Sequence, residues 1–563
     1  MGPVHIHRRT LLFIKHQIFS SLLRIFICGL LIFLFGVYVG SFFSYELQEG
    51  SSFRGEGGIW NGMNIFGGHY GLSEAESFFI DIDETNTSCL ESTVKMYKQY
   101  AATAAAVEQT RSREGMLRIA GFSRLWIPPL HATGGMQFHA FHIYSQLAAR
   151  GHYVHVFVSG SQRKALKTLR YCTDPNTHLS TLCNDENALL VVQQIASTKD
   201  GEYSVEWLKN CQAAFHAVHA KKPFDVIHSE SWSAVPNIFQ LGVPFAVTWH
   251  GSMLDWFRNE LNYIVHNFHL KHKMPGPNVM KRMQALSSAV ALEEYMLLTV
   301  PHHIVISDVA KHDLINIQHI PPERVELIYN GVNRHLFRQR EGREVRNAFL
   351  TQHHVPLGNF IVGCGGRLEA IKGHLQLSTA MRLIMKRFGD VTLLVAGDGN
   401  QKPLYQTLRA EGFSVVMLGM LNQENLAYFY QSLDVFVDPF YQYHGLNTVM
   451  IEAALSGVPL VVTDLGSARS VVPCKAYGRR FPLGNVPALV REILYYKVHP
   501  EKAAEAARNA RERAMHLFGS DTMASQYESL FYRIKNQPVG SQNITGKLVC
   551  NHVYPALCYR EVS

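Results

Sequence analysis

One segment of the chain, residues 434–466, has the pattern of a strand, a loop, a helix and a second strand. Val435 to Val437 predict a buried strand, and apolar residues at helical spacing predict a helix after the loop. The helix is expected to end at Gly457, because glycine accepts the left-handed conformation that closes many helices. Leu460 to Thr463 then predict the second strand. Strands that alternate with helices in this way form a parallel sheet covered on both faces, which constrains the fold more than any other feature of the chain.

The junction between the loop and this helix is a candidate anion site. The first helical turn, near Leu446, Asn447 and Thr448, has backbone N–H groups without partners inside the helix, and these favour an anion such as phosphate. Glu452 lies one or two turns further along. A carboxylate at that position in the helix, beyond the anion site of the first turn, cannot hold phosphate. It could accept hydrogen bonds from ribose hydroxyls. The alternative is an ordinary glutamate on a solvent-facing side of the helix.

The same segment resembles the nucleotide-sugar site of the retaining glycosyltransferases of family 4 (group 1), whose pattern is E-G-(x6)-E-A-(x3)-G-x-P. The chain reads His444-Gly445-(x6)-Glu452-Ala453-(x3)-Gly457-Val458-Pro459. It departs from the family at the first glutamate, which is His444 here. The resemblance implies the GT-B fold and places His444, Gly445 and Glu452 at the donor.

A second match concerns two cations after a predicted strand. The chain reads Gly366-Arg367-Leu368-(x3)-Lys372-Gly373, and the family pattern is G-R-(x4)-K-G. The resemblance implies that Arg367 and Lys372 hold the donor diphosphate, with Gly366 beside them. A surface charge pair is the alternative. The nearby glycines do not complete the dinucleotide-binding pattern G-x-G-x-x-G, since Leu368 stands at the position of the third glycine.

The first half of the chain contains a double glycine between a predicted strand and a predicted helix. Gly134 and Gly135 precede a helix expected from Met136 to Arg150 and a strand from Tyr153 to Val158, which is the order of a Rossmann-like half. Glycine lets the backbone approach a ligand closely at a helix N-terminus. A tight turn is the alternative, but a double glycine also occupies this loop in the resembled family.

Two further candidates follow predicted strands. His250 comes directly after the strand 245–248, at the carboxyl end where parallel sheets bind ligands. In the resembled family a histidine here reaches the transferred sugar, whereas a histidine taken alone is more often structural. Gly397 follows the strand 391–396. Its turn either reverses the chain, which is the preferred interpretation, or approaches the nucleotide.

The fold predicted for the whole chain is α/β: a GT-B fold with two Rossmann-like domains facing a cleft, preceded by an N-terminal transmembrane helix. Further strands are expected at 224–228, 302–306 and 325–329 in the first half, and at 360–362, 414–418 and 434–437 in the second. The predicted divisions are 1–24 cytosolic tail, 25–43 transmembrane signal anchor, 44–115 stem, 116–333 N-terminal domain on the acceptor side, 334–499 nucleotide-sugar domain, 500–535 closing helices and 536–563 tail.

The N-terminal segment determines the expected compartment. Ile25 to Phe43 lack any charge and are long enough to cross a bilayer as a helix. Basic residues precede the segment and acidic residues follow it, so the N-terminus is expected in the cytosol and the body in the lumen of the Golgi or another secretory compartment. A cleaved signal peptide is the competing interpretation, but no clear small-x-small site follows.

Sequons and cysteines are compatible with a luminal body. Acceptor sequons begin at Asn86 and Asn543, although such triplets are common by chance. Cys172 and Cys183 bracket a polar loop, and Cys550 and Cys558 lie in the tail; either pair could form a disulfide. No cysteine and histidine spacing is typical of zinc.

Composition and charge exclude some function classes. Of the 563 residues, 47% are hydrophobic and 17% charged, which is typical of a globular chain rather than a disordered one. The net charge of +8 suits an anionic substrate or a membrane surface, but no dense basic stripe with aromatic residues indicates nucleic acid. Asp81-Ile-Asp83 resembles a metal-binding DxD, but it lies in the predicted stem rather than after a strand of a nucleotide-binding domain.

The resemblance covers about 116–534 and implies a membrane-anchored retaining glycosyltransferase. A nucleoside-diphosphate sugar is the expected donor, and a glycan, a lipid or a small molecule is the acceptor. No cofactor and no metal are expected, because Arg367, Lys372 and the helix amides would neutralise the leaving diphosphate while His250 lies near the sugar. A nicotinamide enzyme is disfavoured because its fingerprint is missing. A catalytically silent GT-B protein, acting as a sugar- or nucleotide-binding or scaffold subunit, remains the alternative because His444 replaces the first glutamate.

Overall fold

The structure is a computed structural model, and the residues that it describes fall within one compact unit. It describes residues 86–127, 130, 134–161, 165–174, 180–197, 205–233, 242–271, 276–337, 343–441 and 445–537. The predicted membrane span, Asp81, Asp83, His444 and residues 538–563, which contain the sequon and the cysteine pair of the predicted tail, lie outside these ranges. No helix within these ranges is long and apolar enough to cross a membrane.

The first half of the chain is built on one sheet whose strands are ordered β4-β3-β5-β2-β1-β6-β7-β8-β9. All neighbours pair in parallel except β3, which runs antiparallel to both β4 and β5. The strands are β1 (Arg118–Ser123), β2 (Tyr153–Ser161), β3 (Thr168–Thr173), β4 (Ser180–Cys183), β5 (Leu190–Ser197), β6 (Val226–Glu230), β7 (Phe245–Trp249), β8 (His303–Val305) and β9 (Val325–Leu327). The helices between them include α4 (Gly135–Ala149), α5 (Val205–His219), α7 (Met253–Lys271), α8 (Pro277–Thr299) and α9 (Asp308–Asn316).

The second half is built on a fully parallel sheet with the order β12-β11-β10-β13-β14-β15. Its strands are β10 (Phe360–Gly365), β11 (Val391–Ala396), β12 (Val415–Gly419), β13 (Val435–Asp438), β14 (Leu460–Thr463) and β15 (Arg479–Phe481). Its helices are α10 (Glu344–Gln352), α11 (His374–Arg387), α12 (Lys402–Ala410), α13 (Gln423–Gln431), α14 (Thr448–Leu455), α15 (Gly466–Val471) and α16 (Val486–Val498). The order is that of a Rossmann sheet, in which ligands bind outside the carboxyl ends of the strands where the order reverses. That point lies between β10 and β13.

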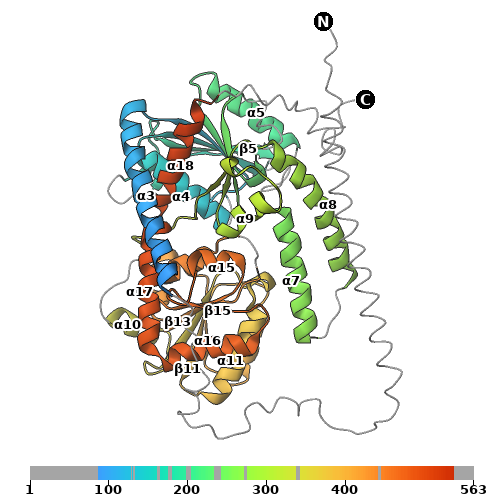
Figure 1. The fold of residues 1–563 in the computed structure, drawn as a ribbon, viewed down its shortest axis with the longest axis vertical. Coiled ribbons are helices and arrows are strands. Elements are labelled where there is room, and N and C mark those ends of the chain that lie inside the picture. Colours follow the sequence, from blue (N-terminus) through green and yellow to red (C-terminus); the bar gives the residue numbers. More distant parts are fainter. Residues whose placement is uncertain are drawn as a thin grey trace. The chain divides into compact units, whose positions relative to one another are not determined.

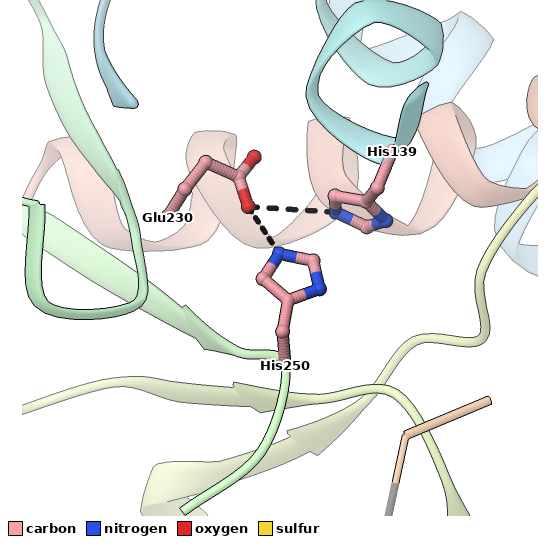
Figure 2. Close-up of side chains that lie close together, drawn as sticks. All are labelled: His139, Glu230 and His250. Atoms are coloured by element: carbon pink, nitrogen blue, oxygen red, sulfur yellow. Dashed lines mark hydrogen bonds and ion pairs between the residues drawn. The ribbon is translucent and has the colours of Figure 1, made fainter. Parts of the chain in front are cut away.

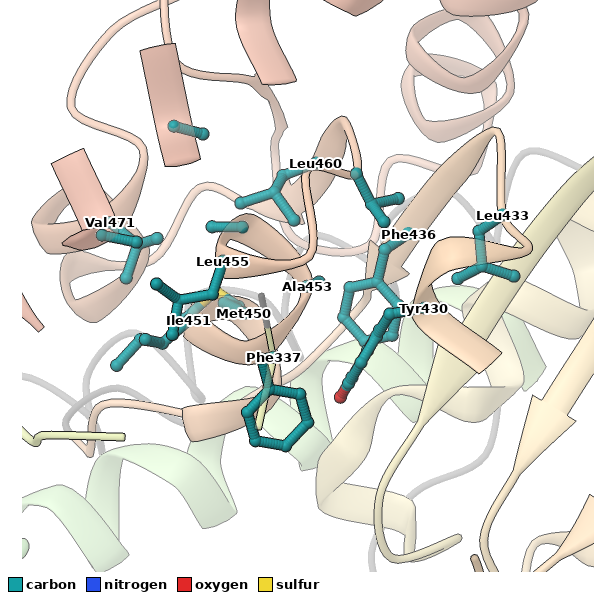
Figure 3. Packing of buried hydrophobic residues seen from close by; sticks show 14 of the residues in the cluster. Phe337, Tyr430, Leu433, Phe436, Met450, Ile451, Ala453, Leu455, Leu460 and Val471 are labelled. Carbon is teal, nitrogen blue, oxygen red and sulfur yellow. The ribbon is translucent and has the colours of Figure 1, made fainter. Parts of the chain in front are cut away.

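Helix α14 is held in place by the core of the second sheet. Its residues Met450, Ile451, Ala453 and Leu455 are fully buried and pack with apolar side chains from neighbouring strands and helices (Figure 3). The helix ends as predicted, since Gly457 follows with a φ of 76°. Burial of one face therefore fixes the helix and points its N-terminus toward the end of β13.

Helix α3 (Asn86–Glu114) lies outside the two sheets, with α17 (Pro500–Leu517) beside its start and α18 (Ser520–Lys535) beside its later part (Figure 1). Helix α3 forms the second part of the predicted stem and packs against both α17 and α18. A disulfide joins Cys89 of α3 to Cys474, which the sequence did not indicate.

The two Rossmann-like halves confirm the α/β GT-B prediction for the described part of the chain. Strands β11 and β14 have the predicted bounds, and the other predicted strands are present with ends shifted by a few residues. Strands β3, β4, β5 and β15 were not predicted. The predicted disulfide between Cys172 and Cys183 is confirmed, and it closes the β3–β4 hairpin.

Candidate active site

The segments that follow β10 and β13 are joined by a chain of hydrogen bonds that starts at a lysine. Lys372 Nζ donates to Asn447 Oδ1 over 2.7 Å, and Asn447 Nδ2 donates to Asp438 Oδ2 over 3.0 Å. Asn447 is the N-cap residue of α14, yet its side chain makes no capping hydrogen bond because both polar atoms are used in this way. The lysine is thus fixed beside the first turn of α14, where partly positive N–H groups point.

Burial acts on both charged ends of this chain. It lowers the pKa of Lys372 to about 8, with Asp438 opposing the shift and Arg367 adding to it. Burial also raises the pKa of Asp438 to about 6, against the attraction of Lys372. Keeping Lys372 in its charged form therefore costs free energy when no ligand is bound. A second anion beside the ammonium group would stabilise that charged form.

Arg367 and the nearby glycines occupy the loop after β10. The Arg367 guanidinium is well exposed and donates to Glu369 over 2.7 Å, so it can turn toward a ligand at low cost. Gly397 has a φ of 135°, and a Cβ at this position would lie 1.9 Å from the carbonyl oxygen of Gly366. Backbone packing alone therefore requires glycine at position 397, in line with the preferred interpretation of that turn.

Glu452 is held inside the second half of the molecule. Its Oε2 accepts a hydrogen bond of 2.8 Å from the Tyr430 hydroxyl of α13, and the Thr448 side chain also bonds to it. Burial raises the pKa of Glu452 to about 7, and both hydrogen bonds oppose this shift. Glu452 is therefore not an ordinary solvent-facing glutamate.

The carboxyl edge of the first sheet carries a cluster of His139, Glu230 and His250 (Figure 2). Glu230 is the last residue of β6, and His250 directly follows the neighbouring strand β7. Glu230 Oε2 lies 2.5 Å from His250 Nε2 and 3.9 Å from His139 Nε2. The rings of His139 and His250 meet edge to face with centroids 4.6 Å apart.

Burial controls the charge of this cluster. It lowers the pKa of both His139 and His250 to about 4, so both imidazoles are neutral at physiological pH. Burial raises the pKa of Glu230 to about 7, although His139 opposes this shift. One donor atom from each of the three residues lies within 4.8 Å of the others, so the cluster could hold a metal ion. Two imidazoles and one carboxylate are a donor set that zinc accepts.

The glycine-rich loop of the first half leads directly to this cluster. Gly134 is the N-cap residue of α4 in extended conformation, Gly135 is the first helical residue, and His139 lies about one turn further along. The predicted loop-to-helix junction is therefore present.

The two halves are joined through Asn330. Its Oδ1 lies 3.0 Å from His139 Nδ1, and its Nδ2 donates to the carbonyl oxygen of Leu446 over 3.1 Å. Gly445, with a φ of 79°, precedes Leu446 and lines a pocket together with residues that follow His250. The structure thus brings His250 and the segment before α14 to the same region. His444 lies outside the described residues.

Sequence reasoning did not identify His139, Glu230, Asn330 or Asp438. A signal was available for two of them, because Glu230 and Asp438 follow the predicted strands 224–228 and 434–437 within two residues, at the sheet edge where ligands bind. His139 lies inside a helix and Asn330 in a turn, where the local pattern gives no such indication.

Two family models match the chain, one on each half. The model described as Glycosyltransferase Family 4 matches residues 133–336, and the model described as Glycosyl transferases group 1 matches residues 359–496. The first match includes the cluster of His139, Glu230 and His250, and the second includes Lys372, Asp438 and α14.

Individual relatives agree with these matches. An uncharacterized glycosyltransferase of Methanocaldococcus jannaschii is 29% identical over 31% of this chain and 45% of its own length. A GDP-mannose-dependent alpha-mannosyltransferase of Mycobacterium tuberculosis is 30% identical over 31% of this chain and 43% of its own length. The chain thus spans less than half the length of these curated relatives. The solved structure of sucrose-phosphate synthase from Thermosynechococcus elongatus has the same fold, with a TM-score of 0.56 and 21% identity over 74% of this chain and 98% of its own.

Proposed function

The chain belongs to the group 1 glycosyltransferases of family 4, and we propose on this basis that it moves a sugar from a nucleoside-diphosphate sugar to an acceptor, with retention at the anomeric carbon. The observation that carries the proposal is the position of Lys372. Its ammonium group is fixed by Asn447 at the N-terminus of α14, at the point where the order of a Rossmann sheet reverses. A diphosphate is the ligand that fits a cation beside helix amides.

These groups act on the leaving diphosphate. Negative charge grows on it as the bond to the sugar breaks, and Lys372, Arg367 and the first-turn amides of α14 stabilise that charge from fixed positions. His250 faces the sugar, and the departing phosphate accepts the proton of the acceptor hydroxyl. The donor carries UDP, GDP or a related nucleotide, and the acceptor is a glycan, a lipid or a small molecule.

A membrane anchor is part of the proposal. The uncharged segment from Ile25 to Phe43 supports it, with the body in the lumen of the Golgi or another secretory compartment. The disulfides Cys89–Cys474 and Cys172–Cys183 add support, because such bonds persist mainly in oxidising compartments. Endoglycosidase treatment of the expressed protein should increase its mobility. An unchanged mobility together with protease sensitivity of the body in intact microsomes would refute the luminal placement.

Turnover with a panel of nucleotide sugars tests the reaction. The full chain is incubated with each of several UDP-, GDP- and ADP-sugars, and release of nucleoside diphosphate and free sugar is measured with and without EDTA. We expect one donor to be consumed in preference to the others, with most activity retained in EDTA because Lys372, Arg367 and helix amides serve the diphosphate. Activity that is lost in EDTA and restored by manganese would contradict the metal-independent mechanism.

A catalytically silent protein is the second candidate function. The observation that favours it is His444 at the position of the first glutamate of the family pattern. An imidazole offers one acceptor atom when neutral and none when protonated, so it is a poor substitute for a carboxylate that binds a sugar hydroxyl. Binding of nucleotides without turnover of any donor, followed by a gain of activity in His444→Glu, would establish this second function.

A further inference from the structure

Glu230 is a buried carboxyl group to which the proposed reaction assigns no role. Its side chain has no exposed surface, and its Oε1 makes no hydrogen bond within the described structure. The titratable groups that face it are His139 of α4, His228 of β6 and His250 after β7, together with the hydroxyls of Tyr144 and Tyr527. Among the described residues, only histidines form ion pairs with Glu230. A carboxyl group buried without a cationic partner destabilises the fold, which indicates a functional reason to keep it.

The hydrogen bonds of His139 determine where its proton lies. Asn330 donates through Nδ2 to the Leu446 carbonyl, so its Oδ1 faces His139 and accepts from Nδ1–H. The remaining ring nitrogen, Nε2, has a lone pair and accepts from the Tyr527 hydroxyl over 3.2 Å. His139 therefore has no proton to give to Glu230.

The hydrogen bonds of His228 also determine which of its ring nitrogens carries the proton. Tyr527 uses its proton on His139, so it accepts from the Thr248 hydroxyl over 2.7 Å. Thr248 in turn accepts from His228 Nε2 over 2.7 Å, which leaves Nδ1 to accept from Tyr144 over 2.8 Å. All hydrogen bonds in this series point one way, and neither His139 nor His228 can donate to Glu230. Of the histidines around it, only His250 can donate.

We propose that Glu230 is a positioning residue for His250: its Oε2 accepts the Nε2 proton and thereby fixes Nδ1 as a hydrogen-bond acceptor for a hydroxyl of the donor sugar. Figure 2 shows Nε2 of His250 pointing at Glu230 and the second ring nitrogen pointing away from it. This inference rests on the proposed function of the site. A neutral imidazole has one N–H and one lone pair, so the partner of one nitrogen decides the role of the other.

The kinetic test compares wild type with Glu230→Leu in the full chain, using the preferred donor from the panel. We expect kcat to fall about 10- to 100-fold, because the leucine side chain cannot accept the Nε2 proton and His250 loses the partner that orients it. Affinity for UDP and GDP, measured by calorimetry, should remain unchanged because Lys372 and α14 are untouched. An unchanged kcat in Glu230→Leu would overturn the proposal.

The tautomer of His250 can be tested without turnover. Nitrogen chemical shifts of His250 in the free protein, identified through His250→Gln, report which ring nitrogen carries the proton. We expect Nδ1 to be unprotonated at pH 8.5. A proton on Nδ1 at pH 8.5 would overturn the proposal even in a chain that transfers no sugar.

Discussion

The electrostatics of the proposed diphosphate site depend first on three hydrogen-bonded side chains, those of Lys372, Asn447 and Asp438. Lys372 is bonded to Asn447, and Asn447 is bonded to Asp438, so the cation is held at one position rather than at the end of a mobile side chain. Arg367, in contrast, is exposed and pairs with Glu369 on the loop after β10. Preorganised charge stabilises a transition state more than mobile charge does, because no reorganisation accompanies the reaction. Lys372 should therefore contribute more to kcat than Arg367.

Replacement of Lys372 by Ala should raise donor KM and lower kcat, with kcat reduced by about 100- to 1,000-fold, as for the loss of one fixed group that stabilises transition-state charge. Arg367→Ala should change both constants in the same direction but less. Steady-state kinetics with the preferred donor measure both effects. Arg382→Ala is the matched control, since Arg382 forms a surface ion pair with Glu411. If Lys372→Ala and the control have equal kinetic constants, the assignment of Lys372 to the diphosphate site is wrong.

At the scale of single residues, the sequence predicts groups that belong to a contiguous motif. Arg367 and Lys372 are separated by four residues, so their shared context is visible in one line of sequence. Glu230 and His250 are twenty residues apart and meet only because β6 and β7 are neighbours in the sheet. His139, Asn330 and Tyr527 come from even more distant segments. Contacts of this kind depend on the tertiary fold, and local patterns do not contain them.

At the scale of elements, helix α3 is bonded at both of its ends to parts of the chain that are distant in sequence. Near its start, Cys89 is bonded to Cys474 and Thr93 accepts from Arg513 over 2.8 Å. Near its end, Arg111 donates twice to the buried Glu528 of α18. Burial alone would raise the pKa of Glu528, but hydrogen bonds from His152, Arg111 and Arg150 outweigh it and lower the pKa to about 2.

Removal of the disulfide that anchors α3 should destabilise the protein. Cys89 and Cys474 are 385 residues apart, and a bond that closes a long loop restricts the unfolded chain more than one that closes a short loop. We expect Cys89→Ser to lower the free energy of unfolding by about 2–4 kcal/mol and to reduce Tm. Cys183→Ser is the matched control, because the bond it removes spans 11 residues. Equal Tm values for Cys89→Ser and wild type would show that packing alone holds α3.

The elements that the sequence predicted and those that it missed differ in composition. Strands β11 and β14 are fully buried, contain one threonine each among apolar residues, and have the predicted bounds. Strand β15 is Arg-Arg-Phe and β4 is half exposed, so neither has the apolar pattern of a buried strand. Strand β3 pairs antiparallel at the edge of a parallel sheet, which the repeated strand-helix pattern does not anticipate. The sequence therefore predicts the buried apolar strands, and it does not predict the exposed or antiparallel edge strands.

At the scale of the whole molecule, many histidines are buried in the neutral state. Burial lowers the pKa of His139, His142, His155, His250 and His374 to about 4 and of His303 to about 3, and it lowers that of His228 as well. In the unfolded chain these groups have their ordinary pKa of about 6.5. The unfolded state therefore binds more protons than the folded state between these values, so the stability that neutral burial provides is present above pH 6.5 and is lost as the pH falls toward 4.

Three buried carboxyl groups act in the opposite direction. Burial raises the pKa of Glu230 and Glu452 to about 7 and that of Asp438 to about 6. The folded state binds protons at these groups before the unfolded chain does, so acidification from pH 7 to 4.5 favours folding through each of them. The histidines whose pKa is lowered outnumber these carboxyl groups, so the net effect of acid in this window should be destabilising.

We therefore expect the free energy of unfolding, and with it Tm, to be lower at pH 5 than at pH 7.5. Thermal unfolding at the two pH values, at constant ionic strength, measures the difference in Tm. Glu230→Gln and Glu452→Gln separate the two contributions, because each variant removes one carboxyl group whose protonation favours folding at pH 5. The loss of Tm on acidification should accordingly be larger in both variants than in wild type. A Tm that rises between pH 7.5 and pH 5 would mean that the carboxyl groups dominate and that the buried histidines are protonated or solvated in the folded protein.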